Sequence, residues 1–317
     1  MMEKHIGNFS LNKLRLKKQI YKGAWSVFRM VLLLVISFVI LYPLIAKVGI
    51  SFMSTADLLD RTTILIPKNP TISNYKIVWN AVDYIPTFCY TVCVTLLISA
   101  LQLITTTLAA YGLARFKFWG SKLVTAFVLL TLIVPTQAIL TPLYIRFRFF
   151  NPLQFIQIGG NLSGISLINT LVPMLLLSVT AMGFKNGLFI LMLMQYFKNQ
   201  PKVLEEAAYV DGCGRFKTFA RIMIPGAVPM LVTVFLFSFV WQWNDYYYSS
   251  IFMPEGKLLA RQLLNIDFSL SSGLSLELSE AVSFAPKVLL LIAPLLIIYL
   301  FTQRFFVESI ERSGIVG

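Results

Sequence analysis

Six long apolar stretches constrain this chain more than any other feature. Each reaches the roughly twenty residues that a helix needs to cross a bilayer. They cover residues 28–48, 88–113, 123–144, 172–196, 226–247 and 284–303. Hydrophobic residues make up 57% of the chain and charged residues only 13%, about half the charged share of ordinary soluble domains. A soluble core of this size cannot bury so much apolar surface, so the sequence predicts an all-α integral membrane protein with six transmembrane helices.

The basic residues that flank these stretches predict the orientation of the chain. Lys and Arg gather in residues 1–29, 115–122, 197–225 and 304–317, and fewer of them lie in the alternate loops. Flanking basic residues favour the cytoplasmic side of a membrane, so both termini are expected in the cytoplasm. The first stretch is too long for a cleaved signal peptide. The expected parts are a basic cytoplasmic tail (1–27), a six-span domain (28–303) and a C-terminal cytoplasmic tail (304–317).

The distribution of charge argues against nucleic-acid binding, and the scarcity of histidine and cysteine argues against a metal site. The net charge of +13 would suggest nucleic-acid binding in a soluble chain. Beside apolar spans it is better explained by contact with anionic lipid head groups, so we expect a lipid bilayer and no nucleic acid as partner. His5 is the only histidine, and Cys89, Cys93 and Cys213 form no Cys-x-x-Cys pair. We therefore expect no metal site.

The loop between the fourth and fifth stretches, residues 200–225, is the most informative polar segment. Pro201 suits the first turn of a helix, and Lys202–Val210 reads as a short helix with acidic residues near its positive end. Gly212 permits a sharp stop, Arg215–Met223 restarts as a second helix, and Pro225 precedes the next span. The sequence predicts a cytoplasmic helix–turn–helix, either a docking element for a partner or a solvated amphipathic loop.

The order of residues in this loop resembles the EAA loop of ABC importer permeases. Glu206-Ala207-Ala208 is followed at fixed spacing by Gly212, Ile222 and Pro225. In that family the loop contains the coupling helix, which docks in a cleft of the ATP-binding subunit. The resemblance implies a coupling role for Glu205, Glu206, Ala207, Ala208, Asp211, Gly212, Arg215, Phe216, Ile222 and Pro225.

Further motifs resemble the carbohydrate-uptake, MalG-like branch of these permeases. They are residues 110–116 (AYGLARF), 135–137 (PTQ), 142–144 (PLY), 235–245 and 303–307 (QRFFV). The resemblance implies the fold of an ABC type I importer permease in a bacterial plasma (inner) membrane. It also implies import by alternating access of an oligosaccharide or related glycan. The implied partners are a second homologous permease in a heterodimer, an ATP-binding-cassette ATPase dimer and an extracytoplasmic solute-binding protein.

Catalysis is not expected in this chain. It has no Gly-x-x-x-x-Gly-Lys-Ser/Thr phosphate loop, so ATP and Mg²⁺ are expected on the partner ATPase and no cofactor on this chain. Glu205 and Glu206 are helix neighbours that point in different directions, a poor geometry for paired acid–base catalysis. The alternatives are a self-contained secondary transporter, which would favour several acids within its spans, and a membrane-embedded enzyme.

Two polar clusters within the apolar stretches are candidates for the solute pathway, because polar groups at membrane depth usually face a cavity or a partner. Lys185 and Asn186 interrupt the fourth stretch between two glycines, which could break the helix; the alternative is a lysine that reaches the membrane surface. The fifth stretch contains Gln242, Trp243, Asn244 and Asp245. Amide, carboxylate and aromatic groups suit a sugar, although an interfacial aromatic belt would explain the tyrosines that follow.

Overall fold

The computed structural model describes residues 2–60, 62–151, 164–266 and 276–314. These residues are mostly helical. They contain one isolated antiparallel bridge, between Phe150 and Ile165, and they form no strand. The chain divides into two compact units. Unit 1 consists of residues 1–75 and 272–289, and unit 2 consists of residues 76–271 and 290–317.

Unit 1 is dominated by the helix α1 (Met2–Ser51), which contains both the basic tail and the first predicted span. Its segment Tyr21–Ser51 is long and apolar enough to cross a membrane. The large apolar side chains along most of this segment are exposed, as expected of a helix whose solvent is lipid. Two short helices follow, α2 (Thr55–Leu59) and α3 (Ser73–Ala81), the second continuing into unit 2.

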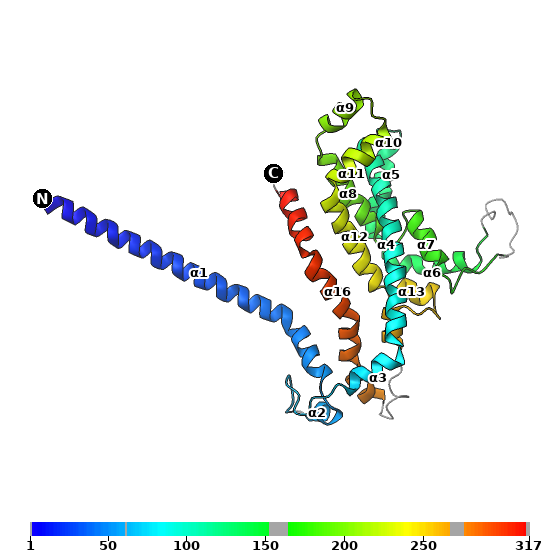
Figure 1. The fold of residues 1–317 in the computed structure, drawn as a ribbon, viewed down its shortest axis with the longest axis horizontal. Helices are drawn as coiled ribbons and strands as arrows, with labels where there is room; N and C mark the ends of the chain where they lie inside the picture. Colours follow the sequence, from blue (N-terminus) through cyan, green and yellow to red (C-terminus); the bar gives the residue numbers. More distant parts are fainter. Residues whose placement is uncertain (1, 61, 152–163, 267–275, 315–317) are drawn as a thin grey trace. The chain divides into compact units, whose positions relative to one another are not determined.

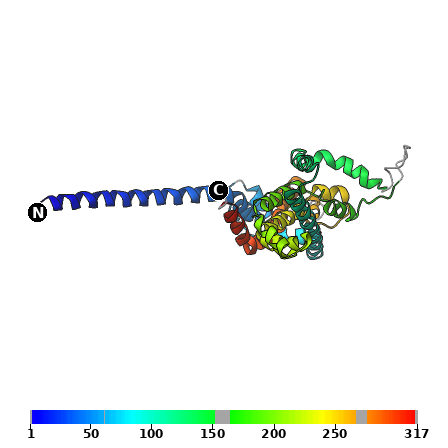
Figure 2. The same ribbon diagram turned by 90° about the horizontal axis from the view of Figure 1, so that it is seen from above.

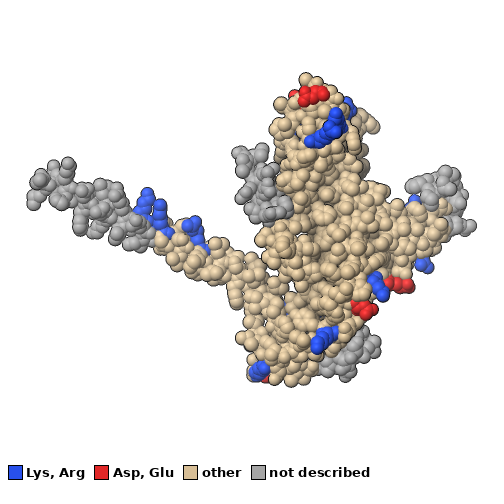
Figure 3. Space-filling view, viewed as in Figure 1, with Lys and Arg blue, Asp and Glu red and all other residues tan. Residues whose placement is uncertain are grey.

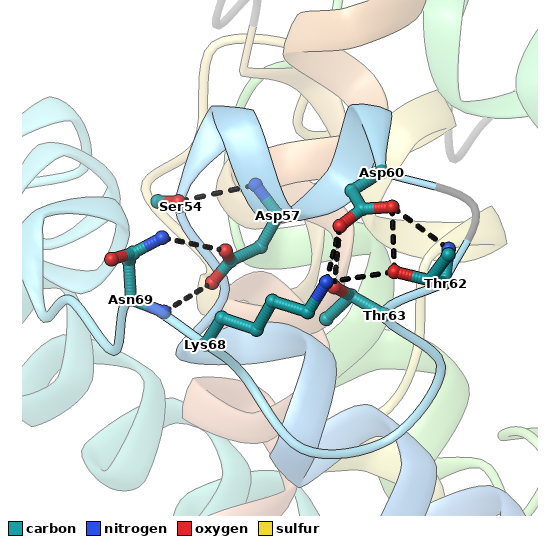
Figure 4. Close-up of polar contacts among 7 residues, drawn as sticks. All are labelled: Ser54, Asp57, Asp60, Thr62, Thr63, Lys68 and Asn69. Carbon is teal, nitrogen blue, oxygen red and sulfur yellow. Dashed lines mark hydrogen bonds and ion pairs between the residues drawn. The ribbon is translucent and has the colours of Figure 1, made fainter.

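Polar contacts order the connection between α2 and α3 (Figure 4). The carboxylate of Asp57 accepts hydrogen bonds from the backbone and side-chain nitrogens of Asn69, at 2.8 and 3.1 Å. The carboxylate of Asp60 pairs with Lys68 at 2.5 Å and accepts from the backbone nitrogen and hydroxyl of Thr62. These contacts, first of all the one with Lys68, lower the pKa of Asp60. The connection between α2 and α3 is therefore ordered by side-chain and backbone hydrogen bonds.

Unit 2 is built around the long helix α4 (Tyr84–Arg115). The helices α8 (Asn186–Asn199) and α12 (Val228–Trp243) make the most extensive contacts with it, and α7 (Val172–Val179) adds a third. In Figure 2 the cyan α4 lies among these green and yellow helices. Large apolar side chains from α4, α8 and α12 form the core between them, including the fully buried Phe189, Leu193 and Val234.

The remaining helices that lie wholly within the described residues of unit 2 are short. They are α5 (Ser121–Ile133), α6 (Thr136–Arg148), α9 (Val203–Val210), α10 (Arg215–Thr218), the π-helix η1 (Phe219–Met223), α11 (Ile224–Gly226), α13 (Tyr247–Phe252) and α14 (Leu259–Asn265). The helix α16 (Leu276–Gly314) begins in unit 1 and ends in unit 2.

Three helical segments of the described residues are long and apolar enough to cross a membrane, or up to five if two bent pairs count as one span each. The three are Tyr21–Ser51, Tyr84–Arg115 and Ser283–Gln303; the bent pairs are Ser121–Ile133 with Thr136–Arg148, and Arg215–Gly226 with Val228–Trp243. The chain is therefore a helical membrane protein, and its spans are less regular than six straight helices.

Two of the six expected spans are broken in the structure. The stretch 123–144 bends by 104° between α5 and α6. Pro135 lies at this break, where it cannot donate a backbone hydrogen bond and holds the preceding Val134 in an extended conformation. The stretch 172–196 consists of α7 and α8, which are separated by residues 180–185. Residues 152–163, between the third and fourth stretches, and residues 267–275, between the fifth and sixth, lie outside the described part.

Candidate functional site

The predicted helix–turn–helix is present at one end of unit 2. Figure 1 shows α9 and α10 beyond the ends of α8 and α12, with α13 towards the other end of the unit. The first arm is α9, and the second arm runs through α10, η1 and α11 into α12. The described bounds of both arms agree with those expected from the sequence to within a few residues.

Gly212 terminates α9 in the conformation that only glycine adopts without strain. Its φ is +77°, in the left-handed region. The backbone nitrogen of Gly212 donates to the carbonyl of Tyr209, and that of Cys213 donates to the carbonyl of Ala208. This pair of bonds is the Schellman motif, which satisfies the last carbonyls of a helix. The turn between the arms is therefore fixed by backbone geometry.

The first arm has one buried face and one exposed face. Glu205 and Ala208 are 7% and 3% exposed and face the helical bundle. The exposed face carries Val203, Glu206, Ala207 and Val210, at spacings i, i+3, i+4 and i+7. Of the two alanines expected to approach a partner, Ala207 lies on the exposed face and Ala208 on the buried face.

The second arm adds more exposed groups to this end. Phe216 is 78% exposed, and the guanidinium of Arg215 lies 5.6 Å from the centre of the Phe116 ring. Asp211, which follows α9, and Pro225 in α11 are exposed, whereas Ile222 packs against the core. In Figure 3 this end of unit 2 bears acidic and basic atoms above a broad uncharged band.

Glu205 contacts α4 rather than solvent. Its carboxylate accepts a 2.8 Å hydrogen bond from the hydroxyl of Tyr111 and pairs with Arg115 at 3.4 Å. The sequence identified Tyr111 and Arg115 only as part of the resembling motif at 110–116. Their contact with Glu205 was not predicted. A buried carboxylate needs a cationic partner, and this requirement could have indicated the contact.

The second polar cluster lies where α7 and α8 are interrupted. Ala181 and Lys185 both have positive φ values, +57° and +62°, which are uncommon outside glycine. Lys185 is exposed, with its ammonium 5.4 Å from the centre of the Phe184 ring and 6.0 Å from that of Trp241. The structure therefore has a broken helix here, with a lysine held beside aromatic rings.

Asn186 begins α8 and points into the protein. Its side chain is 2% exposed, and neither its amide nitrogen nor its amide oxygen has a hydrogen-bond partner. A Cβ atom on Gly183 would meet the amide nitrogens of Gln102 and Asn186 at 2.5 and 3.2 Å. Gln102 in turn accepts a hydrogen bond from Ser238. The break in the helix therefore brings buried amides from α4 and α8 to one place.

The residues Gln242 to Asp245 have four different environments. Trp243 is buried, and its indole nitrogen donates to the carbonyl of Leu291 in α16 at 3.0 Å. Gln242 is 9% exposed, and the exposed Asn244 donates to the carbonyl of Val240 in its own helix. The carboxylate of Asp245 is 7% exposed and accepts from the backbone nitrogens of Tyr248 and Ser249. These contacts give Trp243 and Asp245 structural roles.

Replacing Asp245 with alanine should therefore lower stability. Its carboxylate satisfies two backbone N–H groups at the start of α13, and the loss of such a cap costs about 1 kcal/mol. The matched control is Asn244→Ala, since this neighbouring side chain is exposed and bonds only its own helix. Thermal unfolding of the purified chain in detergent measures both. An equal melting temperature for the two variants would contradict the capping role.

Comparison with known proteins was made at the level of sequence and of fold. Residues 102–311 match the family model of the binding-protein-dependent transport system inner membrane component. The chain is 28% identical to the probable ABC transporter permease protein YurM of Bacillus subtilis (strain 168), over 95% of this chain and 91% of YurM. It is 27% identical to the maltodextrin transport system permease protein MdxG of the same organism, over 90% of this chain and 94% of MdxG.

A solved structure has a similar fold. It is a bacterial ABC transporter involved in the import of the acidic polysaccharide alginate, with a TM-score of 0.64 at 22% identity over 89% of this chain and 96% of that one. The family match covers more than half of the chain and includes both arms of the helix–turn–helix and the break before α8. The chain belongs to the family of binding-protein-dependent transport system inner membrane components, and it is accordingly a transport permease and not an enzyme.

Proposed function

We propose that this chain is one of two homologous permeases in an ATP-driven importer of oligosaccharides or related glycans. A binding protein delivers the sugar from outside, and an ATPase dimer on separate subunits binds ATP and Mg²⁺. Both termini of the chain lie in the cytoplasm, on the side of the helix–turn–helix. The family match to binding-protein-dependent systems supports a binding protein and an ATPase as partners.

The observation that carries this proposal is the exposed face of α9. Val203, Glu206, Ala207 and Val210 form one stripe along this face, and Val210 is 88% exposed. Anchors at i, i+3, i+4 and i+7 are the pattern by which a helix enters a groove on a partner. Large apolar side chains exposed outside the membrane are unfavourable unless a partner covers them. The exposed Phe216 in α10 adds a large apolar side chain to this end of unit 2, and Glu206 can orient the partner.

The substrate class follows from the relatives. MdxG is named for maltodextrin transport, and the transporter with the similar fold is described as an importer of alginate. Both substrates are chains of sugar units. We propose that Lys185, Asn186, Gln242 and Asn244 face the pathway in at least one state of the cycle, and that Trp243 and Asp245 shape its wall.

The bent helices fit transport by alternating access. We propose six spans, in which α5 with α6 forms the third, α7 with α8 the fourth, and α12 the fifth. Broken helices expose backbone groups that are tolerated at membrane depth only beside a cavity or a protein partner. When the ATPase dimer closes on ATP, the paired coupling helices approach each other and the pathway turns outward; hydrolysis resets it.

Affinity purification of the tagged chain from native membranes tests the proposal. We expect an ATP-binding-cassette subunit, a second permease and a binding protein to co-elute. The recovered assembly is then placed in liposomes and offered a panel of maltotetraose, galactooligosaccharides and alginate oligomers. ATP-dependent uptake of one of them supports the sugar assignment. A chain that elutes alone and moves a solute without ATP would favour a self-contained secondary transporter and overturn the proposal.

A further inference from the structure

Glu205 and Glu206 are neighbours in α9, yet they lie in opposite environments. Successive residues of a helix point roughly 100° apart. Glu206 is exposed on the face proposed to meet the ATPase, whereas Glu205 is 7% exposed and faces α4. A partner docked on the exposed face of α9 can therefore contact the carboxylate of Glu206 but not that of Glu205.

Both carboxylate oxygens of Glu205 are engaged by α4. Oε1 accepts from the Tyr111 hydroxyl at 2.8 Å, and Oε2 lies 3.4 Å from Nε of Arg115. The same arginine donates through Nη2 to the carbonyl of Gln200 at 2.8 Å. Gln200 directly follows the last residue of α8, where a cation is favoured by the helix dipole. One arginine thus joins the last turn of α4 to the end of α8 and the start of α9.

These contacts are shielded from water by aromatic rings. The Tyr111 ring lies 5.5 Å from that of Phe197 in α8 and 4.6 Å from that of Phe219 in η1. The side chains of Arg115 and Glu205 are 5% and 10% exposed. An ion pair in such surroundings is weakly screened by salt, and removal of one partner leaves a buried charge uncompensated. Loss of either charged partner is therefore expected to be destabilising.

The contact of Glu205 with Tyr111 and Arg115 joins α9 to α4, and α7, α8 and α12 pack against α4. These contacts therefore link α9 to the helix at the centre of unit 2. We propose that Glu205, Arg115 and Tyr111 form a latch that makes α9 and α4 move together, with Glu205 as a positioning residue that does not contact the ATPase. The proposal rests on the proposed function, because the ATPase supplies the movement.

The test compares two adjacent glutamates in the reconstituted assembly, Glu205→Gln and Glu206→Gln. The readouts are the amount of ATPase that co-elutes and the number of sugar molecules imported per ATP hydrolysed, with maltotetraose or whichever sugar of the panel the unaltered assembly imports. Glu205→Gln should retain the ATPase and its hydrolysis, while import per ATP falls at least about fivefold, a typical size for coupling between sites. Glu206→Gln should lose ATPase and leave the ratio unchanged in the remaining complexes.

Tyr111→Phe provides a second variant that keeps the aromatic packing and removes one hydrogen bond. It should lower import per ATP in the same direction as Glu205→Gln. The latch is overturned if both variants reduce only the yield of assembly and leave the ratio unchanged, because that is the result of a purely structural role. It is also overturned if Glu205→Gln releases the ATPase as Glu206→Gln does. An unaltered chain that recovers no ATPase would instead overturn the proposed function.

Discussion

Replacing Gly212 with valine should abolish most ATPase binding while membrane insertion continues. Gly212 has a φ of +77°, a conformation that costs an ordinary residue about 1–2 kcal/mol and a β-branched residue more. This backbone strain arises in the Schellman turn, which orients α10 relative to α9. We expect ATPase co-elution to fall about tenfold or more, since each 1.4 kcal/mol is a factor of ten in affinity.

Gly212→Asn is the matched control for this prediction, because asparagine tolerates the left-handed conformation better than other side chains. No heavy atom lies within 4 Å of a Cβ built on Gly212, so the size of the new side chain alone gives neither variant a clash. The asparagine variant should retain much of the ATPase. Equal loss in both variants would show that backbone conformation is not the reason.

Replacing Gly187 with alanine should destabilise the contact between α5 and α8. A Cβ atom at this position would lie 2.1 Å from the hydroxyl of Thr131 and 3.1 Å from the carbonyl of Val128, both in α5. The two helices must separate to admit it, and overpacking of this kind costs about 1–3 kcal/mol. Thermal unfolding of the chain in detergent, together with the yield of folded protein, measures the effect.

Two further variants make this test specific. Gly112→Ala in α4 is the matched control, because no heavy atom lies within 4 Å of its Cβ position; its melting temperature should be unchanged or slightly raised. Thr131→Ala removes the nearest clashing atom, so the double variant with Gly187→Ala should recover part of the loss. A single Gly187→Ala variant as stable as the unaltered chain would contradict the close approach of α5 and α8.

Features that depend on neighbouring residues were predictable from the sequence. The helix at 202–210 and the stop at Gly212 follow from local propensity and backbone chemistry, and the structure places both as expected. The interruption before Asn186 was also signalled by the two glycines around it. Pro135 is also visible in the sequence, but the 104° bend beside it depends on how α5 and α6 pack against their neighbours.

The contacts of Glu205 and Asp245 were not predicted from the sequence. Glu205 was predicted to have a coupling role, whereas its side chain contacts Tyr111, which lies 94 residues earlier in the chain. Asp245 looked like a sugar ligand because of its residue type and aromatic neighbours. In the structure its carboxylate is occupied by backbone nitrogens three and four residues later. An aspartate shortly before a helix is a known capping signal, and Asp245 lies two residues before the start of α13. The sequence therefore also allowed a capping role.

Site-specific photocrosslinking at Val210 tests the central claim most directly. This side chain is 88% exposed on the stripe of α9, so a photoreactive residue placed there in active membranes should form an adduct with an ATP-binding-cassette ATPase. Ile133, which is 78% exposed at the end of α5, is the control and should give no such adduct. An ATPase adduct at Val210 alone is the predicted result. Adducts at Val210 only with lipid or with unrelated proteins would contradict the account.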